Sequence, residues 1–238
     1  MPRMPRMPPA ARRRPLAAEL SAYAEAMLAA VLVALFFRTW VVEAFNIPSG
    51  SMEPELLPGD HIVVDKFLYG GSAGPWGRLL PRREPARGDV VVFRSPAEPA
   101  RDLVKRFVGL PGETVEIADK RLVVDGTARE EPYAVHRDPD LLPRSPDVPR
   151  LLATRDHFGP LTLGAGEYIA LGDNRDDSQD SRVYGAVPRS HLKGRAILVY
   201  WSFDDGAAGS VRGRGAALRR LLDNALHFFE RTRWGRTG

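Results

Sequence analysis

The sequence contains no cysteine among its 238 residues. This absence excludes disulfide bonds, a thiolate nucleophile and metal sites built on cysteine. It leaves the redox compartment open, because a chain without cysteine can work on either side of a membrane. The length is sufficient for one sizeable domain, or for one domain that carries a small second one.

Lysine is also scarce, since 30 of the 34 basic residues are arginines and the lysines are Lys66, Lys105, Lys120 and Lys193. A codon bias toward arginine accounts for most generic positive charges. A lysine that persists can do chemistry that arginine cannot, because a guanidinium keeps its proton whereas a desolvated ammonium can lose it. The four lysines are therefore candidates for a catalytic base.

The formal net charge is only +4, but the arginines are concentrated at the two ends of the chain. Basic ends of this kind are typical of solvated tails or of contact with a membrane surface. No helix-turn-helix pattern and no aromatic-basic RNA motif accompanies them, so no nucleic-acid partner is predicted. The arginines in question are Arg3, Arg6, Arg12, Arg13, Arg14, Arg212, Arg214, Arg219, Arg220, Arg231, Arg233 and Arg236.

Only one long uncharged run is present, AMLAAVLVALFF at 26–37. Twelve helical residues span about 18 Å, less than the roughly 30 Å of a bilayer core. The run could be a buried globular helix, or the apolar part of a cleaved signal peptide with 42–44 near the cut. We favour a membrane helix over about 23–42, with Glu25 and Arg38 reaching the headgroups. The positive-inside rule then places the arginines before it in the cytoplasm and the following domain across the membrane.

Downstream of this run the sequence consists of short β-branched segments bounded by Gly, Pro and Asp, which is typical of a mostly β domain. These segments are 61–70, 88–95, 101–110, 113–126, 166–174 and 194–203. Near the end, apolar residues between Leu218 and Phe229 recur at helical spacing among arginines. They predict an amphipathic helix that either covers the domain or lies on anionic lipid.

The expected organisation has four parts. Residues 1–16 form a disordered basic tail, 17–44 the membrane helix, 45–205 an extracytoplasmic β domain, and 206–238 a basic segment with the amphipathic helix. Within the β domain, 127–164 is rich in Pro, Arg and Asp and is predicted to be a loop-rich insertion.

Two serines, Ser49 and Ser51, lie one glycine apart in IPSGSMEPEL at 47–56. A serine hydroxyl becomes a strong nucleophile only when a base takes its proton. None of the five histidines is adjacent to a motif that would orient it against a carboxylate, although a Ser-His-Asp triad assembled from distant residues stays open. The histidines are His61, His136, His157, His191 and His227.

Lys105 offers an alternative base. In an extended segment Leu103, Lys105 and Phe107 share one face, so the lysine points the way its apolar neighbours point. Burial disfavours the charged form, and lowering a lysine pKa from about 10.4 to about 7.5 costs roughly 4 kcal/mol. A strand lysine with its tip in solvent is the alternative, and Lys66 has a similar context, so spacing alone does not choose between them.

The segment ALGDNRDDSQDSRVYG at 170–185 contains four aspartates within eight residues. The calcium-loop pattern requires glycine at its sixth place, where Ser178 stands, so no metal site is predicted. The segment is better interpreted as a sharp turn, held by bonds from Asp to backbone and to Arg, that delivers a hydroxyl such as Ser178. A separate S-x-x-K match at 190–193 lacks its S-D-N and K-T-G companions and is attributed to chance.

In this order the segments resemble type I signal peptidases, the membrane-bound serine proteases that remove signal peptides from exported proteins. The resemblance rests on a membrane helix followed by FNIPSGSMEPELLPGD (45–60), RGDVVVFRSP (87–96), LVKRFVGLPGE (103–113) and GDNRDDSQDSRVYG (172–185). It implies a mostly β fold: an N-terminal transmembrane helix, an all-β Ser-Lys protease core with a small irregular insertion, and a C-terminal amphipathic helix. The family also has a second β region between the lysine and GDN motifs, which this irregular interval is not expected to form in full.

By the same resemblance, Ser51 is the nucleophile and Lys105 the general base that later protonates the leaving amine. The Ser49 hydroxyl and the Ser51 N–H would bind the oxyanion. Ser178 would orient the lysine amine. The residues expected to hold the turn are Asp173, Asn174, Arg175, Asp180 and Arg182.

The resemblance further implies an extended substrate whose small residues at the first and third positions before the cut enter shallow apolar pockets, as in Ala-x-Ala. The positions that match those pockets are Phe45, Ile47, Pro48, Met52, Leu56, Ile62, Leu103 and Val104. The expected partners are signal peptides of preproteins and the lipid bilayer, at the bacterial cytoplasmic membrane, with one span and without metal or cofactor. A membrane-tethered β domain that binds extended peptides without cutting them is the alternative; a related self-cleaving repressor would instead carry a DNA-reading domain.

Overall fold

The computed structural model describes residues 16–66, 83–143, 149–204 and 226–236. The chain divides into two compact units, 1–39 and 40–238. Residues 1–15 of the basic tail predicted at 1–16, and most of the helix predicted near 218–229, lie outside the described residues. Leu16 is already helical. Each unit is considered by itself.

The first unit is dominated by α1 (Leu16–Phe36), which a π-helical turn η1 (Phe37–Val41) continues. The stretch Glu19–Thr39 has 21 residues and, by length and composition, can cross a membrane. At a rise of about 1.5 Å per residue it spans about 31 Å, which matches a bilayer core. Apolar side chains such as Leu28, Val31 and Leu32 are exposed along it, as expected of a helix that faces lipid.

The helix ends earlier than the sequence predicts. Val42–Asn46 forms strand β1, which pairs with β2, so residues 42–44 are extended and not helical. The β-branched Val42 and the aromatic Phe45 favour a strand, and pairing with β2 satisfies the backbone of this segment.

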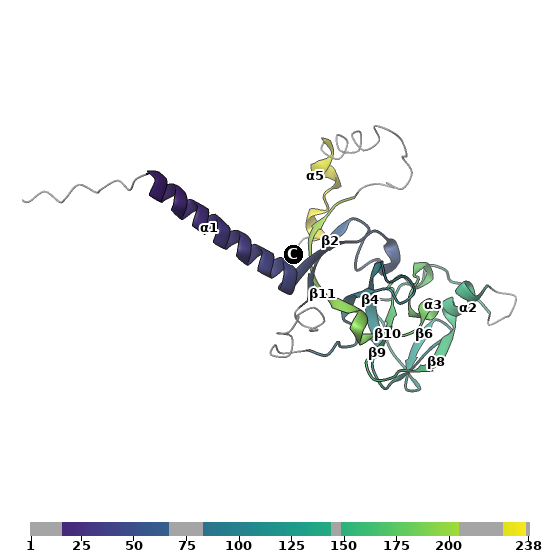
Figure 1. The fold of residues 1–238 in the computed structure, drawn as a ribbon. Helices are drawn as coiled ribbons and strands as arrows, with labels where there is room; N and C mark the ends of the chain where they lie inside the picture. Colours follow the sequence, from purple (N-terminus) through teal and green to yellow (C-terminus); the bar gives the residue numbers. More distant parts are fainter. Residues whose placement is uncertain (1–15, 67–82, 144–148, 205–225, 237–238) are drawn as a thin grey trace, which may run out of the picture. The chain divides into compact units, whose positions relative to one another are not determined.

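The second unit is built on a seven-stranded sheet in the order β1-β2-β11-β3-β4-β9-β10 (Figure 1), in which every neighbouring pair is antiparallel. Besides β1, its strands are β2 (Asp60–Asp65), β3 (Val90–Arg94), β4 (Asp102–Gly109), β9 (Glu167–Leu171), β10 (Val187–Pro188) and β11 (Leu192–Ser202). The mostly β fold predicted from the β-branched segments is confirmed.

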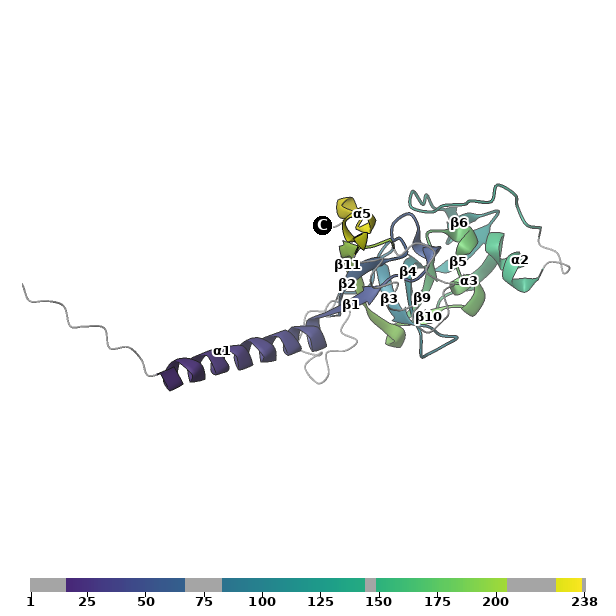
Figure 2. The same ribbon diagram turned by 90° about the horizontal axis from the view of Figure 1, so that it is seen from above.

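A second, four-stranded sheet has the order β7-β6-β5-β8. Its strands are β5 (Thr114–Ala118), β6 (Arg121–Val124), β7 (Thr127–Ala128) and β8 (Phe158–Thr162). The interval 127–164 supplies two of them and helix α2 (Arg150–Asp156), so it contains more regular structure than its composition suggests. In Figure 2 this sheet and α2 lie together, away from β1 and β2.

Apolar packing joins the two sheets. One buried cluster combines Val108 and Leu171 of the large sheet with Val115, Ile117 and Leu122 of the small one. Side chains of this size contribute about 1.5–3 kcal/mol each when fully buried. The small sheet is therefore fixed to the strands β4 and β9 that flank the candidate site.

The remaining elements are short. They are η2 (Gly50–Met52), η4 (Arg175–Asp177), α3 (Ser181–Tyr184), η5 (Arg189–His191), α5 (Phe228–Arg231) and η6 (Trp234–Arg236). The described C-terminal residues contact the large sheet, because Thr232 bridges to Phe203 and the Phe228 ring lies near the Trp201 ring. This contact involves only the described residues at the end of the chain, and the two alternatives for the helix predicted near 218–229 stay open.

Candidate active site

The central feature of the site is a contact between Ser51, in the η2 turn, and Lys105, on β4. The Lys105 Nζ atom lies 2.5 Å from Ser51 Oγ, although 54 residues separate them in sequence. Lys105 is 3% exposed. A nucleophile and a candidate base are thus within hydrogen-bond reach in a largely dry environment.

Burial lowers the pKa of Lys105 from 10.5 to about 8. The Asp180 carboxylate acts in the opposite direction, while Arg182 and Arg101 lower the pKa further. An amine with a pKa near 8 has an appreciable neutral fraction at physiological pH, which a general base requires.

The other lysines are engaged elsewhere. Lys66 pairs with Glu43 at 3.4 Å, Lys120 donates to the Asp138 carbonyl at 2.5 Å, and Lys193 pairs with Asp102 at 2.6 Å. The lining of the cleft around Ser51 contains none of the described histidines. Within the described residues, no group of three or more His, Asp or Glu side chains could hold a metal ion.

Ser49 lies beside the pair, with its Oγ 3.5 Å from Ser51 Oγ. Gly50 separates the two serines, and a Cβ atom at this position would come within 2.6 Å of the Glu53 carboxylate. A side chain at position 50 would therefore require the Glu53 carboxylate to move aside. Ser49 is an exposed residue.

Gly172 brings Ser178 close to Ser51. A Cβ atom on Gly172 would lie 2.2 Å from Ser178 Oγ and 2.4 Å from the Ser51 carbonyl oxygen. Only a residue without a side chain allows this approach. The Ser178 hydroxyl is buried and has no hydrogen-bond partner among the described residues. Gly172 was not among the predicted site residues, although its place at the start of the GDN motif is a signal that could have identified it.

Asp180 and Arg182 hold the turn from inside. The Arg182 guanidinium donates to both Asp180 oxygens at 2.8 and 2.7 Å, and the Gly172 N–H donates to the same carboxylate at 3.0 Å. Burial acts to raise the pKa of Asp180, but the charge and hydrogen bonds of Arg182 outweigh it and lower the pKa. The carboxylate therefore stays ionised near Lys105.

The remaining turn residues connect to partners that sequence reasoning missed. Asp173 accepts two hydrogen bonds from Arg106, the residue after Lys105. Arg175 binds the Glu131 carboxylate through both terminal nitrogens. The Asn174 N–H donates to the Ser51 carbonyl, and Asn174 Nδ2 donates to the Gly50 carbonyl. Opposite charges 44 to 67 residues apart cannot be paired from one sequence alone.

A cleft of ≈ 310 Å³ opens beside the serine and the lysine. Of the eight predicted pocket residues, Leu103 lines it. Cleft residues that the sequence analysis did not name are Ser95, Ala97, Glu98, Arg101, Asp177, Gln179, Val183 and Tyr184. The lining of this cleft is therefore more polar than the apolar pocket expected from the sequence.

The other predicted pocket residues lie in or near a core cluster. Buried in it are Ile47, Met52, Leu56 and Ile62, while Phe45 and Val104 pack against it and Pro48 is exposed. Apolar side chains that point inward from a strand look alike in sequence whether they form a core or a pocket wall, so the pattern could not separate the two.

In this mostly β fold, a serine hydroxyl lies within hydrogen-bond distance of a buried lysine amine. This arrangement defines a candidate Ser-Lys hydrolase site. Residues 20–201 match the family model described as signal peptidase, peptidase S26. The chain therefore belongs to the signal peptidase family.

Curated relatives give the same assignment. Signal peptidase I of Pseudomonas aeruginosa is 37% identical over 207 residues, covering 77% of this chain and 73% of the relative. Signal peptidase I of Leptolyngbya laminosa is 35% identical over 179 residues, covering 72% and 74%. Signal peptidase I of Aquifex aeolicus is 31% identical over 217 residues, covering 72% and 80%.

Proposed function

We propose that the protein is a serine endopeptidase that cleaves N-terminal signal peptides from exported preproteins after small residues of the Ala-x-Ala type. Its family membership supports this activity. The observation that carries the mechanism is the 2.5 Å contact between Ser51 Oγ and the buried Lys105 Nζ. No metal or cofactor enters the proposed reaction.

In the proposed reaction, neutral Lys105 takes the proton of the Ser51 hydroxyl as its oxygen attacks the scissile carbonyl. The Ser49 hydroxyl and the Ser51 N–H donate hydrogen bonds to the oxyanion. The Lys105 ammonium then protonates the leaving amine, and the C–N bond breaks to give an ester on Ser51. A water molecule, deprotonated by Lys105, hydrolyses this ester and restores the free serine.

Ser178 and Asp180 support this cycle by their placement. The buried hydroxyl of Ser178, held beside Ser51 by the close approach at Gly172, is available to accept a hydrogen bond from the lysine amine. Among the charged groups near Lys105, Asp180 raises the pKa of the lysine most and so favours its ammonium form. It would stabilise the charge that develops on the lysine in the transition state.

The substrate would bind as an extended strand beside β4. Asp102–Lys105 pair with β3 on one side, whereas the described pairing of β4 with β9 begins at Arg106. The other edge of this segment is therefore available for backbone hydrogen bonds with a peptide. Leu103 lines the cleft at this edge and would contact a small side chain. The four predicted pocket residues that are buried in the core would affect the substrate only by limiting the depth of the pocket. They are Ile47, Met52, Leu56 and Ile62.

We further propose that α1 anchors the protein in the bacterial cytoplasmic membrane as a single span. The arginines that precede it in sequence would stay in the cytoplasm, which places the catalytic unit on the extracytoplasmic side. Protease digestion of intact spheroplasts tests this orientation. Loss of the catalytic unit under external protease is expected, and its protection would contradict the proposal.

Incubation of the detergent-solubilised wild type and of Ser51→Ala with a purified preprotein tests the activity. Wild type is expected to release the signal peptide at one small-x-small site, which mass spectrometry of the mature N-terminus identifies, and Ser51→Ala to release none. Binding of the preprotein without a cut by the wild type would instead support the peptide-binding alternative.

A further inference from the structure

The insertion between β7 and α2 contains a strap, residues 131–138, that lies along the turn 172–182. The Val135 N–H donates to the Asp173 carbonyl at 2.7 Å, and the Arg175 N–H donates to the Val135 carbonyl at 2.9 Å. Val135 and Asn174 therefore form a parallel bridge. The insertion thus contacts the turn that borders Ser51 and Lys105 directly.

A buried ion pair reinforces this backbone contact. Arg175 donates to the two Glu131 oxygens at 2.7 and 2.5 Å, with side-chain exposures of 2% for Arg175 and 7% for Glu131. The same guanidinium donates through Nε to the Gly172 carbonyl at 3.2 Å. Loss of the Glu131 charge would leave a buried guanidinium without its counter-ion, which the turn could accommodate only by moving.

The turn 172–182 is hydrogen-bonded to the backbone of Ser51 and of its neighbour Gly50. The Asn174 N–H donates to the Ser51 carbonyl at 3.2 Å, and Asn174 Nδ2 donates to the Gly50 carbonyl at 3.1 Å. Gly172 lies against the same Ser51 carbonyl. Movement of this turn would therefore shift the backbone that carries the Ser51 hydroxyl.

A second path leads from the strap to the lysine. The Arg106 guanidinium lies 4.2 Å from the centre of the Tyr133 ring, and the Tyr133 hydroxyl donates to Glu131 at 3.0 Å. Arg106 follows Lys105 on β4. Glu131 therefore connects to both members of the proposed pair.

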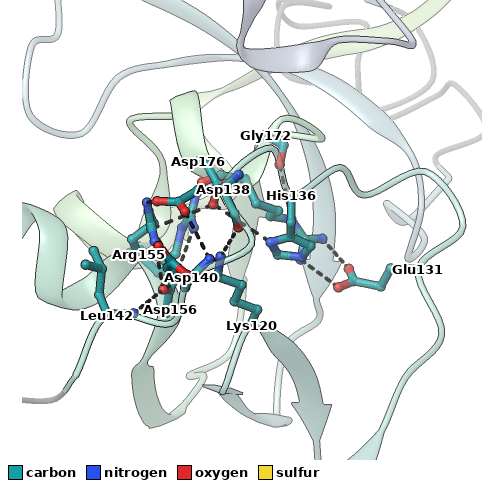
Figure 3. A network of polar contacts seen from close by, with 12 residues as sticks. Lys120, Glu131, His136, Asp138, Asp140, Leu142, Arg155, Asp156, Gly172 and Asp176 are labelled. Atoms are coloured by element: carbon teal, nitrogen blue, oxygen red, sulfur yellow. Dashed lines mark hydrogen bonds and ion pairs between the residues drawn. The ribbon is translucent and has the colours of Figure 1, made fainter.

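The far end of the strap is also fixed. The Asp138 N–H donates to Asp176 at 2.8 Å, and Arg155 of α2 donates to the Asp138 carboxylate at 2.8 Å. Figure 3 shows Asp138, Asp176 and Arg155 gathered on one side of the network and Glu131 on the other. The strap is thus held at both ends while its middle pairs with the turn.

We propose that Glu131 is a positioning residue for signal-peptide cleavage, which acts through Arg175 to hold the turn against the Ser51 backbone and so keeps Ser51 Oγ on Lys105. This inference rests on the proposed function and adds a residue of the insertion to it. Glu131 touches neither the nucleophile nor the base, so its effect falls on the geometry of the reacting groups.

Glu131→Gln tests the proposal, because it removes the charge with little change in shape. We expect kcat to fall roughly 10- to 100-fold, the effect of a small misplacement of reacting groups. We expect KM to stay nearly constant, since the cleft lining is unaltered. The matched control is Glu130→Gln, an exposed neighbour with the same chemistry, which should retain the wild-type kcat. Thermal unfolding of each variant is measured to show that it is folded, and the cleavage rate of the wild type is measured in the same assay.

Glu131→Asp keeps the carboxylate but shortens the side chain by one methylene group. This variant tests the proposal if Glu131→Gln does not fold. It should give an intermediate kcat at constant KM. Wild-type kcat in the folded Gln variant or in the Asp variant, or a change confined to KM, would overturn the positioning role. Failure of the wild type itself to cut a preprotein would instead overturn the proposed function, so the two failures are distinguishable.

Discussion

The Arg106 guanidinium makes two hydrogen bonds to the Asp173 carboxylate, at 2.8 and 2.6 Å, with side-chain exposures of 10% and 1%. Arg106 follows the proposed base on β4, and Asp173 lies in the turn 172–182 that borders the proposed nucleophile, Ser51. This pair therefore fixes the distance between the two segments on which the proposed chemistry depends.

Asp173→Asn should destabilise the catalytic unit. The substitution leaves the largely buried Arg106 charge with only the exposed Glu55 carboxylate, 4.0 Å away, as a counter-ion, and we expect a cost of about 3 kcal/mol. Urea unfolding of the detergent-solubilised full chain measures the change in the free energy of unfolding, with Glu130→Gln as an exposed control. A difference between the two variants that is close to zero would show that Arg106 finds another partner.

Lys105→Arg should be as inactive as Lys105→Ala. A guanidinium does not lose its proton in the accessible pH range and so cannot accept the Ser51 proton, although its positive charge is retained. Preprotein cleavage by the purified variants measures this. Appreciable turnover by the arginine variant would rule out a neutral lysine as the base.

The activity should rise with pH through about 8. The pKa of Lys105 is lowered to about 8, mainly by burial, and the neutral amine is the reactive form. The neutral fraction is about one tenth at pH 7 and dominates above pH 9, so kcat/KM should increase about tenfold over this interval. The measurement is the pH profile of kcat/KM for the wild type. A profile that is level from pH 6 to 9 would contradict the assignment.

Gly172→Ala should lower activity strongly. The new Cβ atom would lie 2.4 Å from the Ser51 carbonyl oxygen, so the backbone of the nucleophile must shift. A displacement of this kind costs roughly 100-fold in kcat. The control is Gly235→Ala, where a Cβ atom meets nothing within 4 Å. Equal rates for the two alanine variants would exclude the proposed sensitivity to this approach.

The sequence predicted five strands of the large sheet, β2, β3, β4, β9 and β11, because most of them are β-branched runs with clear boundaries, as in Val90–Arg94. It also nominated Lys105, since lysine is scarce and this one points with Leu103 and Phe107. Strand β1 was missed because it directly follows the apolar helix, and its pairing with β2 decides its conformation. In the second sheet, β5 and β6 lie in the segment predicted at 113–126. Strands β7 and β8 were missed, because β7 has only two residues and β8 contains glycine and proline.

The site was predicted less completely than the fold. Motifs identified the serines and the GDN turn, because these residues are adjacent in sequence. Arg106 and Glu131 act on the turn through pairings that form only when distant segments meet. The polar lining of the cleft likewise comes from two loops, around Ala97 and Gln179, that contain no regular pattern of their own.

The buried Asp60 ties the two ends of the catalytic unit together. It lies nine residues after Ser51 in sequence, and it accepts hydrogen bonds from Ser202 at 2.5 Å and from Arg236 at 2.7 Å. Arg233 donates to the carbonyl of Pro58, two residues before Asp60, at 3.0 Å. Truncation before these arginines would remove the two charged partners of the buried Asp60 carboxylate, which lies shortly after Ser51 in the chain. A shortened form designed for crystallisation should therefore retain them.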